Sequence, residues 1–365
     1  MRRDTSSLTA LLLAAIAVAG CGSAASADKA GGVSVTHGPV MLTLANSSVA
    51  LSDVPPVQYF VNRVEQLSGG RLVIRVLGSA GPAAPTREAT IVRDVAARRF
   101  DLGWVGSRVF DKLGIGAFRA LSAPMLIDTY PLERAVLASP IPSRMLAAVR
   151  PLGVTPIGLF GEDLRVPIGV TRPILDPADW RGIHFGTWPS GAQEQAIRAL
   201  GATPVEDGGG NRNVDIPSGR IAGFELDVRR LYSDVGVTIA PYIAVNVHLW
   251  PLFDVLIANP GVLASLTSRE RTWLREAASD AQRISVTIAQ ANTTRFLNDA
   301  CRLGARFRTA TNAQLAALRR AFAPVYAELG KEPATSTNLR EIEQLRRATR
   351  PGRSPAIPTH CPASP

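Results

Sequence analysis

Lysine is nearly absent from this chain of 365 residues. Only Lys29, Lys112 and Lys331 are lysine among the 40 basic residues, so arginine carries almost all of the positive charge. A phosphate-cradling P-loop requires a Gly-Lys-Ser or Gly-Lys-Thr sequence, and none of the three lysines has that context. Nucleotide hydrolysis by a P-loop is therefore excluded.

Histidine and cysteine are also scarce, with four and three residues. The histidines are scattered singly, and the chain has neither a His-Glu-x-x-His nor a Cys-x-x-Cys motif. No serine lies in a Gly-x-Ser-x-Gly sequence, the turn that presents the nucleophile of many hydrolases. We therefore predict no metal site, no cofactor and no catalytic residue.

Aromatic residues are only 6% of the chain, although the formal net charge is +10. Such a charge is compatible with nucleic acid, an anionic surface, anionic ligands or an arginine-rich codon usage. Proteins that bind single-stranded nucleic acid interleave basic clusters with stacking aromatics. Here the arginines fall in scattered pairs such as Arg98-Arg99 and Arg319-Arg320. The sequence predicts no nucleic-acid partner.

Long apolar runs are absent except near the N-terminus, where Leu8 to Gly20 follows the basic residues Arg2 and Arg3. About a dozen residues are too few to cross roughly 30 Å of hydrocarbon, so this stretch reads as a signal peptide rather than a membrane span. With 46% hydrophobic and 19% charged residues, the remainder is typical of a globular chain of about two domains.

The apolar run ends Val18-Ala19-Gly20-Cys21, which resembles the lipobox of bacterial lipoproteins. This resemblance implies a signal peptide over residues 1–20, acylation of Cys21 and a flexible tether over residues 21–39. The protein would then be extracytoplasmic and held at the cell membrane by lipid. The alternative is an ordinary secretory signal with a coincidental cysteine.

The two other cysteines, Cys301 and Cys361, form an even pair once Cys21 is acylated. Disulfides persist in oxidising compartments outside the cytoplasm. We predict a disulfide that fixes the C-terminal tail to a helix, with two unpaired buried thiols as the alternative.

From Val40 onward the hydrophobic pattern alternates between strand and helix periods. Strands are predicted at residues 41–44, 71–77 and 101–105, with helices at 57–67 and 86–99 between them. This order predicts an α/β domain with a largely parallel sheet. Further strands are expected at residues 156–160, 167–170, 184–187, 237–247 and 255–259, and further helices at 193–200, 213–221, 268–300 and 312–329. Residues 331–365 are rich in proline and arginine and are expected to be a loosely ordered tail.

The order of several short motifs resembles the solute-binding proteins of TRAP transporters, the dicarboxylate-binding (DctP) family. Each motif is weak alone, and together they span most of residues 40 to 330. The matching segments are Tyr59 to Val76 with Gly69-Gly70-Arg71-Leu72, Arg87-Glu88, Arg99 to Gly103, Ser122 to Leu137, Arg165, Asp179 to Gly182, Ala199 to Pro204, Gly223 to Glu225 and the stretch from His248 to Tyr326.

The resemblance implies a two-lobed, periplasmic-binding-protein-like clamshell with crossing strands and a long C-terminal helix. Lobe I would comprise residues 40–162 and about 250–275, and lobe II residues 163–249 and about 276–330. The implied function is capture of a small organic acid by a monomer that passes the solute to a TRAP membrane permease. Alternatives are a receptor or scaffold lipoprotein without transport, and an enzyme on the same scaffold, which the missing catalytic motifs disfavour.

The resemblance also implies a ligand site, in which Arg165 binds a carboxylate group of the solute. Glu225 orients Arg165 or the hinge. The strand that carries a second carboxylate-reading arginine in the family has Gly186 in that place, Leu226 replaces the family asparagine, and the segment with Gly208-Gly209-Gly210 and Pro217 replaces a helix. These departures leave a different acid, a neutral polar solute or an enlarged pocket open. The other candidate ligand-binding residues are Asn46, Ser47, Ser107, Arg108, Thr187 and Trp188.

Overall fold

The structure, a computed structural model, describes residues 38–48, 54–81, 86–207, 212–231, 236–352 and 356–361. The predicted signal peptide, Cys21, most of the tether and the turn at Gly208–Gly210 lie outside these residues. Among the helices within the described ranges, none has both the length and the apolar composition that crossing a membrane requires.

Strands and helices alternate through the first half of the chain and confirm the predicted α/β class. The strands are β1 (Val40–Asn46), β2 (Leu72–Leu77), β3 (Leu102–Gly106), β4 (Thr155–Gly169), β5 (His184–Thr187), β6 (Thr203–Glu206), β7 (Gly223–Leu226), β8 (Tyr242–Ala244), β9 (Trp250–Ala258) and β10 (Arg306–Arg308). The helices are α1 (Pro55–Ser68), α2 (Arg87–Ala96), α3 (Val109–Lys112), α4 (Tyr130–Leu137), α5 (Ile141–Ala147), α6 (Pro177–Trp180), α7 (Gly191–Ala199), α8 (Arg212–Asp215), α9 (Val228–Arg230), α10 (Pro260–Ser265), α11 (Ser268–Arg302), α12 (Asn312–Ala321), α13 (Ala323–Leu329) and α14 (Pro333–Ala348), with 3₁₀ turns η2 (Gly116–Ser122) and η3 (Arg150–Leu152).

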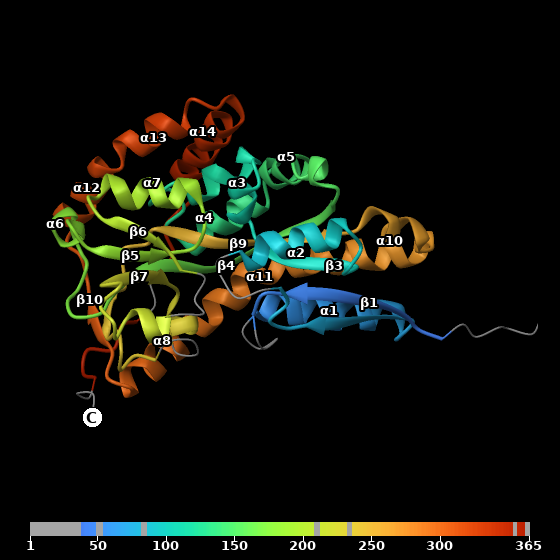
Figure 1. Ribbon diagram of the computed structural model, residues 1–365, viewed down its shortest axis with the longest axis horizontal. Coiled ribbons are helices and arrows are strands. Elements are labelled where there is room, and N and C mark those ends of the chain that lie inside the picture. Colours follow the sequence, from blue (N-terminus) through green and yellow to red (C-terminus); the bar gives the residue numbers. More distant parts are fainter. Residues whose placement is uncertain are drawn as a thin grey trace, which may run out of the picture. The chain divides into compact units, whose positions relative to one another are not determined.

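The strands join in one sheet whose main order is β2-β1-β3-β9-β4-β7-β5-β6, with β8 and β10 branching from β4. The outer groups, β2-β1-β3 and β7-β5-β6, are parallel, whereas β9 and β4 run antiparallel to their neighbours. Figure 1 shows β4 and β9 passing between these two groups, which we call the first and second sheet halves.

Strand β4 changes partner along its length. From Thr155 to Arg165 it pairs with β9, and from Val166 to Gly169 it pairs with β7. Two irregularities in register with β9 interrupt it, the second between Gly161 and Leu164. Such bulges bend a strand, so one continuous strand serves both sheet halves where the sequence predicted two short ones.

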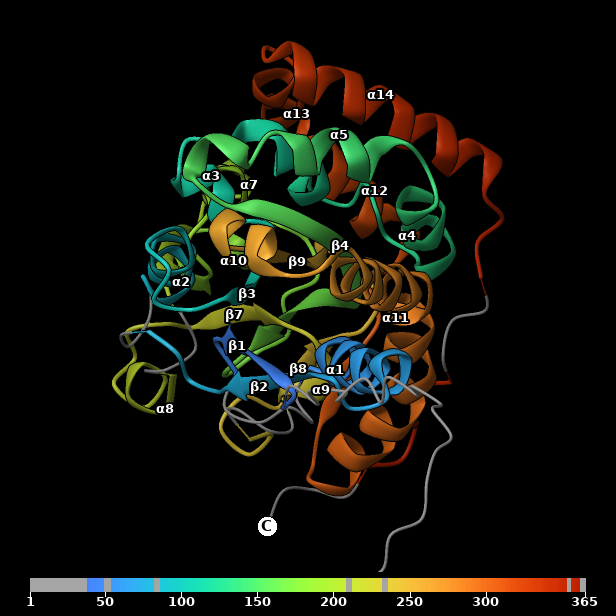
Figure 2. The ribbon, with the colours of Figure 1, turned by 90° about the vertical axis from the view of Figure 1, so that its right-hand side faces the viewer.

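Helix α11 has 35 residues and connects the cores of the two sheet halves. It begins at a capping box, in which Thr267 and Glu270 satisfy each other's backbone N–H groups. Its first turns bury Trp273 and Leu274 in the core of the first half. The helix packs against α1, which lies next to it in Figure 2. Its last turns place Ala300 in the core of the second half.

Besides the division of β4, four predicted elements differ from the structure. The helix predicted at residues 213–221 is replaced by the short helix α8, Arg212–Asp215. Of the strand predicted at residues 237–247, only Tyr242–Ala244 is extended, and the predicted helix at 312–329 breaks at Phe322, before Pro324. The C-terminal region is not loosely ordered throughout, because residues Pro333–Ala348 form α14, which buries Ile342. Proline at the start of a helix costs no hydrogen bond, and the proline content of this region concealed the helix.

Candidate functional site

Two buried arginines from different parts of the chain face the same tryptophan. The guanidinium carbon of Arg108 lies 4.4 Å from the ring centroid of Trp188, and that of Arg165 lies 5.9 Å from it. Arg108 follows β3 in the first sheet half, Arg165 is the last residue of β4 that pairs with β9, and Trp188 follows β5 in the second half. The cluster therefore lies where the two halves meet. Arg108 and Trp188 lie just beyond the carboxyl ends of β3 and β5, where ligand sites of open α/β sheets are found.

Arg165 is held by Glu225 of β7. Its Nη1 donates to Glu225 Oε2 at 2.8 Å, and both side chains are almost completely buried. The second carboxylate oxygen of Glu225 accepts the backbone N–H of Trp188 at 3.4 Å. One carboxylate thus orients both the guanidinium and the segment that carries the tryptophan.

Arg108 has its own carboxylate, Glu88, in the first turn of α2. Arg108 Nη2 donates to Glu88 Oε2 at 2.8 Å, while Glu88 Oε1 accepts the backbone N–H of Gly106 at 3.0 Å. Burial lowers the pKa of Arg108, and the nearby charge of Arg165 acts in the same direction, whereas the charge of Glu88 opposes both. Two guanidinium groups are thus close enough to repel each other.

Both arginines keep hydrogen-bond donors that no protein group satisfies. Among the described residues, Nε and Nη1 of Arg108 and Nε and Nη2 of Arg165 are buried without a partner, and so is Nε1 of Trp188. A buried donor without an acceptor costs about 1–3 kcal/mol, more when it is charged. The cluster therefore contains several buried donors for which the described protein groups supply no acceptor.

The remaining predicted residues differ in their surroundings. Asn46 ends β1, next to β3, and its side-chain amide nitrogen is buried without a partner. Ser47 contributes its carbonyl oxygen to Arg87, at 3.0 Å. Ser107 is buried and contributes its backbone N–H to Phe253. Thr187 is fully buried, and its hydroxyl donates to Gln193 at 3.4 Å, so it supports α7 rather than the cluster.

A third buried arginine lies next to Gly186, where the family resemblance places one. A Cβ atom on Gly186 would lie 3.2 Å from Asp207 Oδ2, and that oxygen accepts a hydrogen bond of 2.5 Å from Arg212 Nε. The Arg212 guanidinium stacks 4.6 Å from the Phe224 ring, and its two Nη atoms are buried without partners. A guanidinium is therefore present beside this strand, although it comes from α8.

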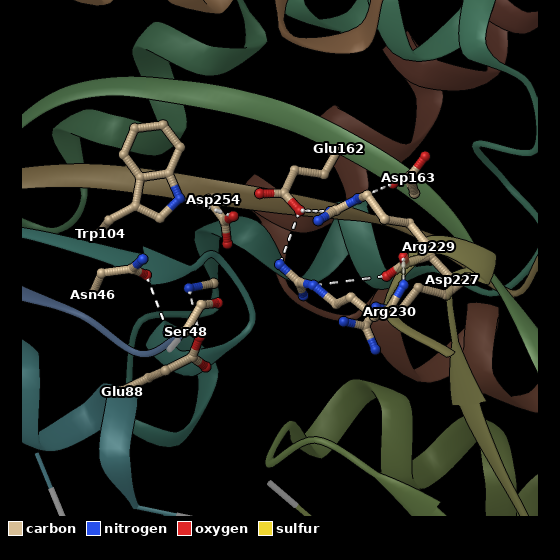
Figure 3. A network of polar contacts seen from close by, with 12 residues as sticks. Asn46, Ser48, Glu88, Trp104, Glu162, Asp163, Asp227, Arg229, Arg230 and Asp254 are labelled. Atoms are coloured by element: carbon tan, nitrogen blue, oxygen red, sulfur yellow. Dashed lines mark hydrogen bonds and ion pairs between the residues drawn. The ribbon is translucent and has the colours of Figure 1, made fainter. Parts of the chain in front are cut away.

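An ion-pair network flanks the cluster at the bulge of β4. Glu162 Oε2 accepts from Arg229 and Arg230, each at 3.0 Å, and Asp163 Oδ2 accepts from Arg229 Nε at 3.0 Å. Figure 3 shows these groups together, with Asn46, Glu88 and Trp104 beside them. Burial raises the pKa of Asp163 to about 6, against the lowering effect of Arg229. These arginines are compensated by carboxylates, so the network joins α9 to β4.

Sequence reasoning missed Glu88, Arg212 and the network around Glu162. Glu88 could have been singled out as an acidic residue in the first turn of a helix that follows a strand. The others depend on contacts between segments distant in sequence. Within the described part of the chain, no three histidine, cysteine or acidic side chains are grouped so that they could hold a metal ion.

The chain is similar in sequence and in fold to proteins of one family. The model of the DctP family, described as bacterial extracellular solute-binding protein, family 7, matches residues 52–332. Solved structures with the same fold include a TRAP periplasmic solute-binding protein from Chromohalobacter salexigens with bound D-glucuronate (TM-score 0.75, 16% identity, covering 83% of this chain and 99% of that chain). Another, from Bradyrhizobium sp., is a complex with D-galacturonate (TM-score 0.75, 20% identity, 83% and 99%). A third, from Anaerococcus prevotii, holds D-glucuronate (TM-score 0.76, 16% identity, 86% and 100%).

The family match covers well over half of the sequence and includes every strand of the sheet except β1. It agrees with the predicted resemblance and with the topology of the sheet. The chain belongs to the DctP family of bacterial extracellular solute-binding proteins.

Proposed function

We propose that this protein binds an acidic sugar of the hexuronate class between its two sheet halves and delivers it to a membrane permease of a TRAP transporter. The observation that carries the proposal is the pair of buried guanidinium groups, Arg108 and Arg165, which both lie near the Trp188 ring and each leave two nitrogens without an acceptor. Planar guanidinium groups match the geometry of a carboxylate with two parallel hydrogen bonds.

The surrounding groups suit a ligand that carries hydroxyl groups as well as a carboxylate. Glu88 and Glu225 neutralise the two arginines, so the cluster presents directed donors rather than a large net positive charge. Carboxylate oxygens accept hydrogen bonds from hydroxyl groups, and the amide nitrogen of Asn46 adds a donor. The ligands named for three solved relatives, D-glucuronate and D-galacturonate, have this combination of groups.

Ligand entry requires the two halves to separate, because the unpaired donors are buried. We place the moving lobes at residues 40–162 with about 250–275, and at residues 163–249 with about 276–330. A ligand that contacts both lobes binds the closed state more tightly and thereby shifts the population toward it. The protein would bind its solute without any chemical step.

We further propose that Cys21 is acylated and anchors the protein to the outer face of the cell membrane. The support is the small-residue sequence before Cys21, which follows a short apolar run. A Cys21→Ala variant, expressed in the native host, should move from the membrane fraction to the soluble extracytoplasmic fraction. A variant that stays in the membrane fraction would contradict acylation.

Thermal unfolding of the mature protein tests the ligand class. D-Glucuronate and D-galacturonate should raise the melting temperature, because a ligand at one hundred times its Kd stabilises the folded state by about 2.7 kcal/mol. D-Glucose has the hydroxyl groups without the carboxylate and should have no effect. Stabilisation by glucose alone would favour a neutral solute. No stabilisation by any small acid, together with a captured protein partner, would favour a receptor without transport.

Variants identify which arginines bind. Arg165→Gln combined with Glu225→Gln removes both charges of the buried pair, so it avoids leaving a carboxylate unpaired, and should abolish uronate binding. Arg212→Gln should weaken binding about tenfold, whereas Arg220→Gln, which changes an exposed arginine of the same segment, should leave it unchanged. Full affinity in the Arg165 and Glu225 double variant would show that the ligand is bound elsewhere.

A further inference from the structure

A cavity lies against the face of β4 that is opposite to Arg165, apart from the arginine cluster. Its volume is about 330 Å³. From β4 it is lined by Leu164 and Val166, the two neighbours of Arg165, and because successive side chains of a strand point to opposite faces, Arg165 points away from it. Helix α11 lines the cavity with Phe296 and Leu297.

Several polar groups on the wall of this cavity already have hydrogen-bond partners in the protein. The Tyr130 hydroxyl donates to Asp163 at 3.1 Å and lies 3.0 Å from the Thr293 hydroxyl. Asn246 both donates to and accepts from the backbone of Ala310, at 2.8 Å each. His248 Nδ1 lies 2.7 Å from the carbonyl oxygen of Asp128. These side chains therefore have little hydrogen-bonding capacity left for a guest.

The wall of this cavity offers few hydrogen-bond partners to ordered water molecules. Its volume corresponds to roughly ten water molecules at about 30 Å³ each, and each ordered water needs two to four polar partners. Most of the surface that lines it is apolar, although about half of the lining residues are polar or charged. The charged ones are ion-paired, Asp163 with Arg229, and Asp128 with Arg319 and Arg346. A guest of similar volume that makes dispersion contacts and needs no hydrogen bonds fits this wall better.

The C-terminal segment covers part of the cavity. Ile357 and Gly352 belong to its lining, and Ile357 is half-buried. The segment is fixed by the disulfide between Cys301, at the end of α11, and Cys361, whose Cα atoms are 4.9 Å apart. The cover is therefore covalently tied to the helix that forms one wall.

We propose that this cavity is a second ligand site, which takes a compact, neutral, apolar organic molecule and is covered by the disulfide-tethered segment around Ile357. The site is distinct in place and chemistry from the arginine cluster. Its occupant contacts β4 and α11, the two elements that connect the sheet halves.

Calorimetric titration of the mature, oxidised protein with indole, and separately with 1-octanol, tests the site. Each should bind at one site with a negative heat-capacity change, the sign of apolar burial. Saturating D-glucuronate should change the affinity for indole less than twofold. Absence of saturable binding, or complete displacement by glucuronate, would overturn the proposal of a separate apolar site.

Variants locate the bound probe. Val245→Phe fills the cavity from the segment after β8 and should weaken indole binding at least tenfold, whereas Val214→Phe, at a position 69% exposed and outside the lining, should not. Because Val245→Phe could disturb folding, Ile357→Ala provides a second test in the C-terminal segment, and indole should dissociate at least threefold faster from it. The Cys301→Ser/Cys361→Ser variant should show the same acceleration. Wild-type affinity in Val245→Phe with wild-type dissociation in Ile357→Ala would place the probe elsewhere.

Discussion

At the scale of single residues, the arginines separate by what their guanidinium groups contact. Arg229 and Arg230 are buried among Glu162, Asp163 and Asp227, which compensate their charges. Arg108 and Arg165 each have one carboxylate and leave two nitrogens without an acceptor. The charges of the first pair are therefore compensated within the fold, whereas the second pair keeps donors that the proposed ligand would use.

The buried carboxyl group of Glu133 makes the stability of the fold depend on pH. Glu133 of α4 is fully buried, and burial, with the charges of Asp163 and Glu162, raises its pKa well above the usual value. The folded state then holds a proton that the unfolded state releases, so stability decreases as pH rises above the ordinary glutamic acid range.

We predict that Glu133→Gln removes this contribution. Urea unfolding between pH 5 and pH 9 should give a free energy of unfolding that decreases with pH less steeply in the variant, by up to about 1.4 kcal/mol per pH unit for one proton. Glu341→Gln, at the surface on α14, is the matched control and should follow the wild type. Parallel curves for Glu133→Gln and the wild type would show that the pKa of Glu133 is not raised in the folded state.

Part of the site could be predicted from the sequence because it lies within contiguous motifs. Arg165, Glu225 and Trp188 were chosen from local segments, and the structure brings the three together. Glu88 is 20 positions from Arg108, and no local pattern indicates that they pair. Arg212 comes from a segment that departs from the family pattern, so its position beside Gly186 required the folded chain.

At the scale of elements, the hydrophobic periodicity predicted an element correctly where that element buries only one of its faces. The predicted helix at residues 57–67 matches α1, which buries Val57, Phe60 and Val64 and ends at Gly69 in the left-handed region (φ 61°). Strand β4 was divided in the prediction because Gly161 to Leu164 interrupts its pattern, and only the pairing with two different strands shows its continuity.

Helix α14 was missed because it lies in a region rich in proline and arginine, and its stability depends on the surface against which it packs. Ile342 is fully buried, and Asn338 donates to the carbonyl oxygen of Ala117 in η2 at 3.5 Å. Tertiary packing of this kind supplies most of a helix's stability in proteins.

We predict that Ile342→Ala destabilises the protein by about 2–5 kcal/mol, the range for removing a large aliphatic side chain from a core. Gln344→Ala, two positions along the same helix and exposed, should change stability by less than about 0.5 kcal/mol. Urea unfolding of both variants measures the difference. Equal stabilities would mean that α14 is not docked in solution.

At the scale of the whole molecule, the arginines behind the net charge of +10 fall into an exposed group and a buried group. Exposed arginines such as Arg283 and Arg302 pair with neighbouring acids on α11, where solvent screens them. Among the described arginines, the buried nitrogens without a partner belong to Arg108, Arg165 and Arg212. A positive surface raises the encounter rate with anions, and in the proposed function the buried donors supply the specificity.

The disulfide between Cys301 and Cys361 is the longest-range covalent constraint in the described part of the chain. It closes a loop of 60 residues that contains α12, α13 and α14. Closing a loop of this length removes conformational entropy from the unfolded chain, equivalent to roughly 4 kcal/mol at 25 °C in the chain-entropy account.

We predict that Cys301→Ser/Cys361→Ser lowers the free energy of unfolding by about 2–4 kcal/mol. The arginine cluster shares no contact with the two cysteines, so uronate affinity should stay within twofold of the wild type. Calorimetry with D-glucuronate alongside urea unfolding separates the two effects, and a loss of affinity larger than the loss of stability would show that the tail shapes the arginine site.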